Sequence, residues 1–100
     1  MLLFNVTVII EDASAADWLA WMKEIHIPQL MATDCFVSYR FLKIVDSPNE
    51  GTSYCVQFIA EDKTNHQTFL DLHEQQFIAE MYAKYPNKLV TFSTLMEFVG

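Results

Sequence analysis

The three histidines are the side chains of this sequence best suited to proton chemistry, because an imidazole gains and loses a proton near neutral pH. His26 stands where a helical pattern meets Pro28. A site role for it competes with a structural one, in which the ring bonds carbonyl groups freed at the end of the helix. His73 is expected to lie in the core or in an interface, and His66 to be solvated near the start of a second helix.

Three polar side chains, Asn5, Arg40 and Gln57, fall in strand-like segments on the same expected face of a sheet. An enclosed polar group needs a hydrogen-bond partner, and an enclosed guanidinium needs a carboxylate, a carbonyl or an anionic ligand. We therefore expect these three residues to line a small-molecule cavity, with His26 and His73 as further candidates. The alternative is that they only hydrogen-bond across an interface between two copies of the chain.

Metal and nucleophile patterns are weak. Cys35 and Cys55 have neither a metal-ligand spacing nor an adjacent base, so buried, reduced thiols are expected. His66 and His73 are separated by too much sequence to form a ligand pair, and no other ligands converge on them. The sequence predicts no metal and no cofactor.

The elements that must position these residues follow from hydrophobic periodicity and from turn residues. We expect strands at 2–10, 35–45, 52–60 and 88–98, and helices at 14–26 and 63–85, with a short helical turn at 28–32. Ser14 is the expected cap of the first helix, and Thr64 or a neighbour caps the second. The order strand, helix, strand, strand, helix, strand predicts a ferredoxin-like α+β sandwich, a four-stranded antiparallel sheet with two helices on one face.

Alternation along the strands predicts which side chains share a face of this sheet. The face expected under the helices is almost wholly apolar: Phe4, Val6, Val8, Val37, Tyr39, Phe41, Tyr54, Val56, Phe58, Val90 and Phe92. The opposite face mixes apolar and small polar groups: Leu3, Asn5, Thr7, Ile9, Ser38, Arg40, Leu42, Cys55, Gln57, Ile59, Thr91, Ser93 and Leu95. Because the chain has helices for one face only, a second copy is predicted to cover the other.

Composition narrows the possible partners. The 100 residues predict a single domain over 1–100, and a net charge of −7 disfavours nucleic acid and anionic membrane surfaces. The start of the sequence alternates like a strand and has no basic leader, which favours a cytoplasmic protein. A hydrophobic fraction of 52% is generous for a small monomer and again favours a homodimer.

Two segments resemble a known family. They are Trp18, Trp21, His26, Ile27 and Pro28, followed by Thr33, Asp34, Cys35 and Phe36, and the ending Pro86, Asn87, Lys88 through Phe92, Ser93, Thr94 and Leu95. They are similar to the helix, strand entry and last strand of the bacterial domain-of-unknown-function family forty-two eighty-six. Asp34 stands where that family usually has Gly, so its turn must hold a Cβ.

The resemblance implies membership of the dimeric α/β-barrel superfamily, whose ferredoxin-like subunits pair sheet to sheet. Some members of that superfamily are cofactor-independent monooxygenases or haem-degrading enzymes that use an Asn on the first strand, a Trp and a His. Asn5 matches in kind and His73 is helix-borne, but both tryptophans lie on the first helix. Two hypotheses stay open: a binding or interaction domain, and a cofactor-independent monooxygenase or isomerase of a small metabolite.

Overall fold

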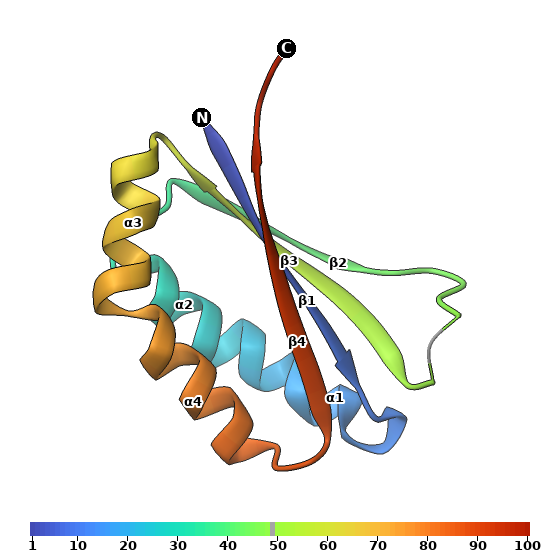
Figure 1. Cartoon of the computed structure of the whole chain (residues 1–100). Helices are drawn as coiled ribbons and strands as arrows, with labels where there is room; N and C mark the ends of the chain where they lie inside the picture. Colours follow the sequence, from blue (N-terminus) through green and yellow to red (C-terminus); the bar gives the residue numbers. More distant parts are fainter. Residues whose placement is uncertain (49) are drawn as a thin grey trace.

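The computed structural model describes residues 1–48 and 50–100, and it confirms the predicted order of the elements (Figure 1). The strands are β1 (Leu2–Ile10), β2 (Ser38–Lys43), β3 (Thr52–Ala60) and β4 (Leu89–Glu97). The helices are α1 (Asp12–Trp21), the π-helical turn η1 (Met22–His26), α2 (Ile27–Met31), α3 (Lys63–Leu72) and α4 (Glu74–Lys84). The hairpin residue Asn49 was predicted to be part of a turn and lies outside the described residues.

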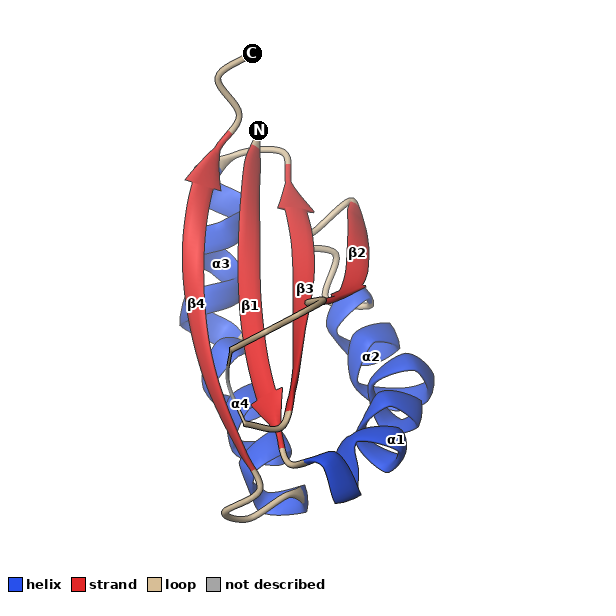
Figure 2. Ribbon diagram, turned by 90° about the vertical axis from the view of Figure 1, so that its right-hand side faces the viewer, coloured by secondary structure: helices blue, strands red, loops and turns tan. Residues whose placement is uncertain are grey.

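The four strands form one antiparallel sheet in the order β2-β3-β1-β4, so β1 and β3 are central. All the helices that the structure describes lie on one side of the sheet (Figure 1), and on the other side the chain after β2 crosses in front of β3 and β1 (Figure 2). Figure 2 shows α3 and α4 beside β4 and β1, with α1 and α2 nearer β3 and β2. The fold is therefore the expected ferredoxin-like one, with one covered and one uncovered face.

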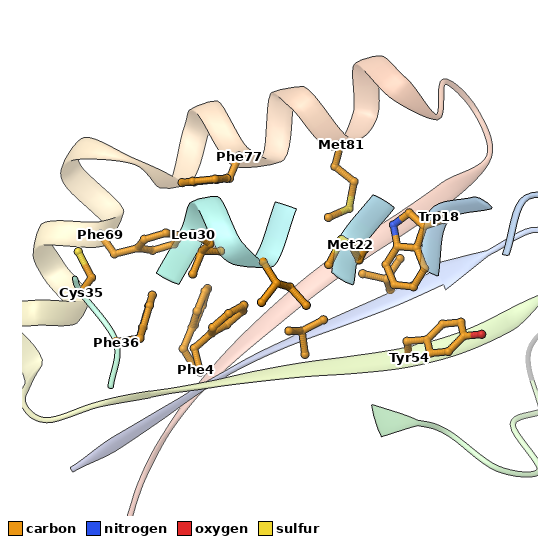
Figure 3. Close-up of a cluster of buried hydrophobic side chains, with 14 of the residues drawn as sticks. Phe4, Trp18, Met22, Leu30, Cys35, Phe36, Tyr54, Phe69, Phe77 and Met81 are labelled. Carbon is orange, nitrogen blue, oxygen red and sulfur yellow. The ribbon is translucent and has the colours of Figure 1, made fainter. Parts of the chain in front are cut away.

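The core lies between the sheet and the helices (Figure 3). Trp18 on α1 is fully buried and meets Phe41 edge to face, with 5.7 Å between the ring centroids. Trp21 is only partly buried, so one tryptophan fills the core while the other lies toward its rim. Such burial stabilises the subunit by roughly 25 cal/mol for each Å² of apolar surface removed from water.

The first helix differs from the prediction at both ends. It begins at Asp12, and Ser14 donates a hydrogen bond to the Glu11 carboxylate at 2.8 Å instead of capping the helix. No break follows His26: the chain passes through η1, where the Ile27 N–H reaches back to the Met22 carbonyl, and continues as α2. A wide turn of this kind relieves the clash that a proline ring causes with the preceding helical turn.

The second helix is capped by Asp62, whose carboxylate accepts a hydrogen bond from the Asn65 N–H at 2.9 Å. It is interrupted at His73, where φ is −130°, so the single predicted helix is two, α3 and α4. The prediction that His66 is solvated is wrong. Its ring is buried against Phe4, with 4.9 Å between the ring centroids. The first turn of α3 packs onto the beginning of β1, and this contact buries the ring.

The predicted face of the last strand is also wrong. Thr91, Ser93 and Leu95 pair with Val8, Val6 and Phe4, which places them on the helix side. Val90 and Phe92 therefore lie on the side of the sheet without helices, where they are 55% and 56% exposed. Because β4 is an edge strand, its more apolar side chains do not have to face the subunit core.

The face without helices, called the uncovered face below, follows from the strand pairings. It carries Leu3, Asn5, Thr7 and Ile9 of β1, Ser38, Arg40 and Leu42 of β2, Ser53, Cys55, Gln57 and Ile59 of β3, and Val90, Phe92, Thr94 and Met96 of β4. Apart from the side chains of β4, and Ser53, these are the residues predicted for that face.

Four of the described residues have left-handed backbone, Asp34, Asp46, Gly51 and Asn87, and Asp34 and Gly51 matter most here. Asp34 has a φ of +60°, so the turn before β2 does hold a Cβ in a conformation that favours glycine. Gly51 has a φ of +86°, and a Cβ there would lie 2.5 Å from the Ile10 carbonyl oxygen. Only glycine fits that second position without movement of the backbone.

In the part of the chain that the structure describes, no helix has both the length and the apolar composition needed to cross a membrane.

Candidate functional site

A pocket of about 160 Å³ lies between the sheet and the helices, on the side opposite the uncovered face. Phenylalanines from four elements form its inner lining, Phe4 on β1, Phe58 on β3, Phe69 on α3 and Phe77 on α4, and Tyr82 on α4 and Phe92 on β4 lie at its edge. In Figure 3, Phe77 and Met81 extend from α4 toward the sheet. The pocket thus lies over the central strands, between the helical segment α1–η1–α2 and the helical segment α3–α4. Amphipathic periodicity directs the lining side chains of these helices inward.

His26 is a polar group in this apolar pocket. Only 4% of its surface is exposed, and its Nδ1 has no hydrogen-bond partner among the described residues. The ring packs against Trp21 and, edge to face, against Phe77, at centroid distances of 4.8 and 5.3 Å. Because η1 widens the helix at this point, His26 occupies a π-type turn, a feature often found at functional sites.

Burial sets the protonation state of this imidazole. Desolvation lowers the pKa of His26 to about 4, and the nearby Glu80 carboxylate opposes that shift only in part. Burial also raises the pKa of Glu74, which lines the same pocket. At neutral pH, His26 is therefore an uncharged ring that can accept or donate one hydrogen bond at Nδ1.

The polar part of the pocket comes from α4 and β4. The Tyr82 hydroxyl accepts a hydrogen bond from the Thr91 N–H at 3.0 Å and lies 3.1 Å from the Thr91 Oγ1. Tyr82 thereby satisfies a backbone donor of the edge strand, and Ser93 lines the pocket beside it. Sequence reasoning missed Thr91 and Ser93 as pocket residues, because it placed them on the other face of the sheet.

The structure brings together three of the predicted site residues on the uncovered face. Gln57 stands between Arg40 and Asn5 in the strand pairings, and its Nε2 donates a hydrogen bond to the Asn5 Oδ1 at 3.3 Å. Asn5 in turn donates to the Thr7 hydroxyl at 3.1 Å. Arg40 is exposed at the β2 edge. That these residues line a cavity stays a prediction.

The other two predicted site residues lie elsewhere. His26 is buried on the helix side of the sheet, so within one subunit it does not approach Asn5, Arg40 and Gln57. His73 stands at the junction of α3 and α4, half-buried beside Phe69 and Phe77 at centroid distances of 6.3 and 6.5 Å. It does not line the pocket that His26 does.

Among residues 1–48 and 50–100, no three His, Cys, Asp or Glu side chains gather closely enough to hold a metal ion. Cys35 is buried and Cys55 partly so, and both are free thiols. Cys55 lies 3.6 Å from the Thr7 hydroxyl, a weak hydrogen bond inside the uncovered face.

Comparison with known sequences gives one family. A family model described as a domain of unknown function, DUF4286, matches residues 1–99. Among curated proteins, none matches the sequence significantly.

Solved structures with the same fold are numerous but distant in sequence. A dimeric ferredoxin-like protein from an uncultured marine organism has a TM-score of 0.74 and 12% identity, covering 100% of this chain and 96% of its own. HapK from Hahella chejuensis has a TM-score of 0.72 and 13% identity, covering 100% and 94%. SnoaB from Streptomyces nogalater, a cofactor-independent oxygenase, has a TM-score of 0.70 and 15% identity, covering 99% and 93%. At these identities the likeness extends to the fold alone.

Proposed function

Because this chain belongs to the DUF4286 family, a domain of unknown function that brings no activity with it, we propose a function from the geometry of its own site: it is a homodimeric domain that binds a small, mostly apolar molecule in the pocket beside His26. The family that the sequence resembles is also the family whose model matches residues 1–99. The proposal therefore covers the whole ferredoxin-like subunit. The ligand is held on the helix side, and the second copy on the uncovered face.

The observation that carries the ligand part is the unpartnered Nδ1 of His26. A buried polar atom without a hydrogen bond costs a protein about 1–3 kcal/mol, and native proteins leave few such atoms. At His26 the atom belongs to a residue that lines a pocket with room for a ligand. A bound molecule that supplies the missing hydrogen bond would remove this cost.

Support for the homodimer comes from the uncovered face and from structures of the same fold. Leu42, Val90, Phe92 and Met96 are all more than 40% exposed there, although they are apolar. Two structures with this fold are described as dimeric ferredoxin-like proteins. A second copy packed on this face about a two-fold axis would bury those side chains and give Arg40, Gln57 and Asn5 polar neighbours from the partner.

Native mass spectrometry of protein purified from cells tests both parts at once. We expect a dimer mass with additional mass from a retained small molecule, which is released on denaturation. The matched variant is His26→Phe, which keeps an aromatic ring but removes both ring nitrogens, and it should form the dimer but retain less of the additional mass. Wild-type protein that carries no ligand and gains none from a cell metabolite extract would contradict the ligand part.

A second candidate function is cofactor-independent oxygenation, the activity named for SnoaB. The specific observation in its favour is an imidazole, that of His26, that lines a mostly apolar pocket and could hydrogen-bond a hydroxyl group of a bound substrate. Asn5 lies on the opposite face of the sheet, so one subunit does not pair an Asn with this His. Oxygen uptake when the retained molecule is added back to ligand-free protein, lost in His26→Phe, would favour this function over binding alone.

A further inference from the structure

We propose that the ligand of this pocket is a neutral molecule of phenol size, a single six-membered aromatic ring whose hydroxyl hydrogen-bonds the Nδ1 of His26. This inference deepens the proposed function and rests on it. It follows from four properties of the pocket: its volume, its aromatic walls, its charge and its one unsatisfied polar atom.

The volume limits the ligand to one ring. An engineered apolar cavity of about 150 Å³ in another protein binds benzene, and the pocket here has about 160 Å³. A ring with one small substituent fills that space. Fused rings would exceed this volume and would extend past the edge of the pocket, where Ile78 and Tyr82 are exposed.

The walls favour an aromatic ring over an aliphatic chain. Five phenylalanines line the pocket, and they come from both the sheet and the helices: Phe4, Phe58, Phe69, Phe77 and, at its edge on β4, Phe92. Their rings pack at a variety of angles, for example 57° between Phe4 and Phe69 and 20° between Phe69 and Phe77. A guest ring can therefore meet both faces and edges, the arrangements that aromatic pairs prefer.

The charge of the surroundings excludes an anion. None of the described lining residues is Lys or Arg, and Glu74 brings a carboxyl group to the pocket. The whole chain carries a net charge of −7. A carboxylate ligand would lose its hydration without gaining a counter-charge, which is costly in an apolar site.

The hydroxyl follows from the unsatisfied nitrogen. His26 is 4% exposed and its Nδ1 has no partner, so a ligand without a polar atom would leave that nitrogen unsatisfied. Nδ1 accepts a hydrogen bond in one neutral tautomer and donates one in the other. A hydroxyl group can do either, so it fits the site whichever tautomer is present.

The test is titration of ligand-free protein at pH 7 with phenol, toluene and benzoate, three single-ring probes that differ in one substituent. Isothermal titration calorimetry should show phenol binding about 3- to 10-fold more tightly than toluene, the ratio expected for one net hydrogen bond. Benzoate should bind at least about 50-fold more weakly than phenol. Equal affinities for phenol and toluene, or tightest binding of benzoate, would overturn the proposal.

A second measurement assigns the hydrogen bond directly in the wild type, and a variant then checks it. The ¹⁵N resonance of the His26 Nδ1 should move when phenol is added and stay nearly fixed when toluene is added. In His26→Phe, phenol should lose its advantage over toluene while toluene still binds. An unchanged phenol preference in this variant would show that the hydroxyl bonds elsewhere.

The two proposals fail in different ways. If native mass spectrometry finds a retained molecule larger than one ring, and none of the three probes competes with it, the phenol class is wrong and pocket binding stands. If no molecule is retained, none is gained from the metabolite extract and no probe binds, both are wrong.

Discussion

His26 is a deeply buried imidazole, and its burial should make the stability of the fold sensitive to mild acid. Its pKa is lowered from 6.5 to about 4 in the folded state, because burial disfavours the charged ring. The unfolded chain therefore binds more protons between these values. The stability that this residue contributes is complete above pH 6.5 and is lost as the pH falls toward 4.

We expect the free energy of unfolding to drop through that window by up to about 3 kcal/mol on account of His26, with a slope of at most about 1.4 kcal/mol per pH unit. Urea denaturation at pH 7, 5.5 and 4.5 measures it. His26→Phe should lose this part of the slope, while the part due to His66, whose pKa burial also lowers, remains in both proteins. Identical pH profiles for the two would contradict the assignment.

For single residues, the sequence identified candidate functional side chains better than it predicted their positions in the structure. His26 drew attention because it precedes Pro28, and the structure places it in a pocket. Its orientation depends on η1, and nothing in the pattern of residues 14–26 distinguishes a wide turn from a break. His66 looked like a solvated residue of a first helical turn, and only the packing of α3 on β1 buries it.

Among the connecting elements, the hairpin between β2 and β3 depends most on a single residue, Gly51. Its φ of +86° strains any other residue, and a new Cβ would lie 2.5 Å from the Ile10 carbonyl oxygen. Gly51→Ala should therefore lower the free energy of unfolding by about 1–3 kcal/mol. Thermal and urea denaturation measure the loss.

The chain supplies the matched control for that substitution. Gly100 has no atom within 4 Å of the position of a new Cβ, so Gly100→Ala should leave stability unchanged. Equal behaviour of the two alanine variants would mean that the hairpin relaxes around residue 51 at little cost.

Elements were predictable where two signals agreed. For β1 and β3, alternation and turn residues led to the observed bounds, and Asn5 and Gln57 lie side by side on the face predicted for them. For β4, alternation alone could not say which set of side chains faces the helices. The apolar set, Val90 and Phe92, lies on the uncovered face, and only pairing with β1 fixes this.

At the scale of the whole molecule, a single substitution can test the proposed homodimer. Val90 is 55% exposed on the uncovered face and does not line the pocket of His26. In a single subunit Val90→Lys is therefore tolerated, whereas in the proposed dimer it brings two charges into an apolar interface. Sedimentation velocity at micromolar concentration should show a dimer for the wild type, and at least about a 10-fold higher dissociation constant for the variant.

Val99→Lys is the control, because Val99 is 93% exposed beyond the end of β4. It should leave the dimer intact. A wild-type protein that sediments as a monomer would remove the basis for the homodimer. The ligand proposal would be unaffected, because the pocket beside His26 lies within one subunit.

The π-type turn also gives the first helix a tolerance to changes in length. A regular helix rotates each following side chain by about 100° when one residue is lost, which would turn Ile27 and Leu30 out of the core. At Met22–His26 the wider turn already holds one residue more than a regular helical turn, so omission of an exposed residue there, such as Glu24, leaves a standard turn and keeps the later side chains in register. This short stretch can thus shorten where the rest of the helix cannot, although a standard turn would bring back the clash with the Pro28 ring that the wide turn relieves.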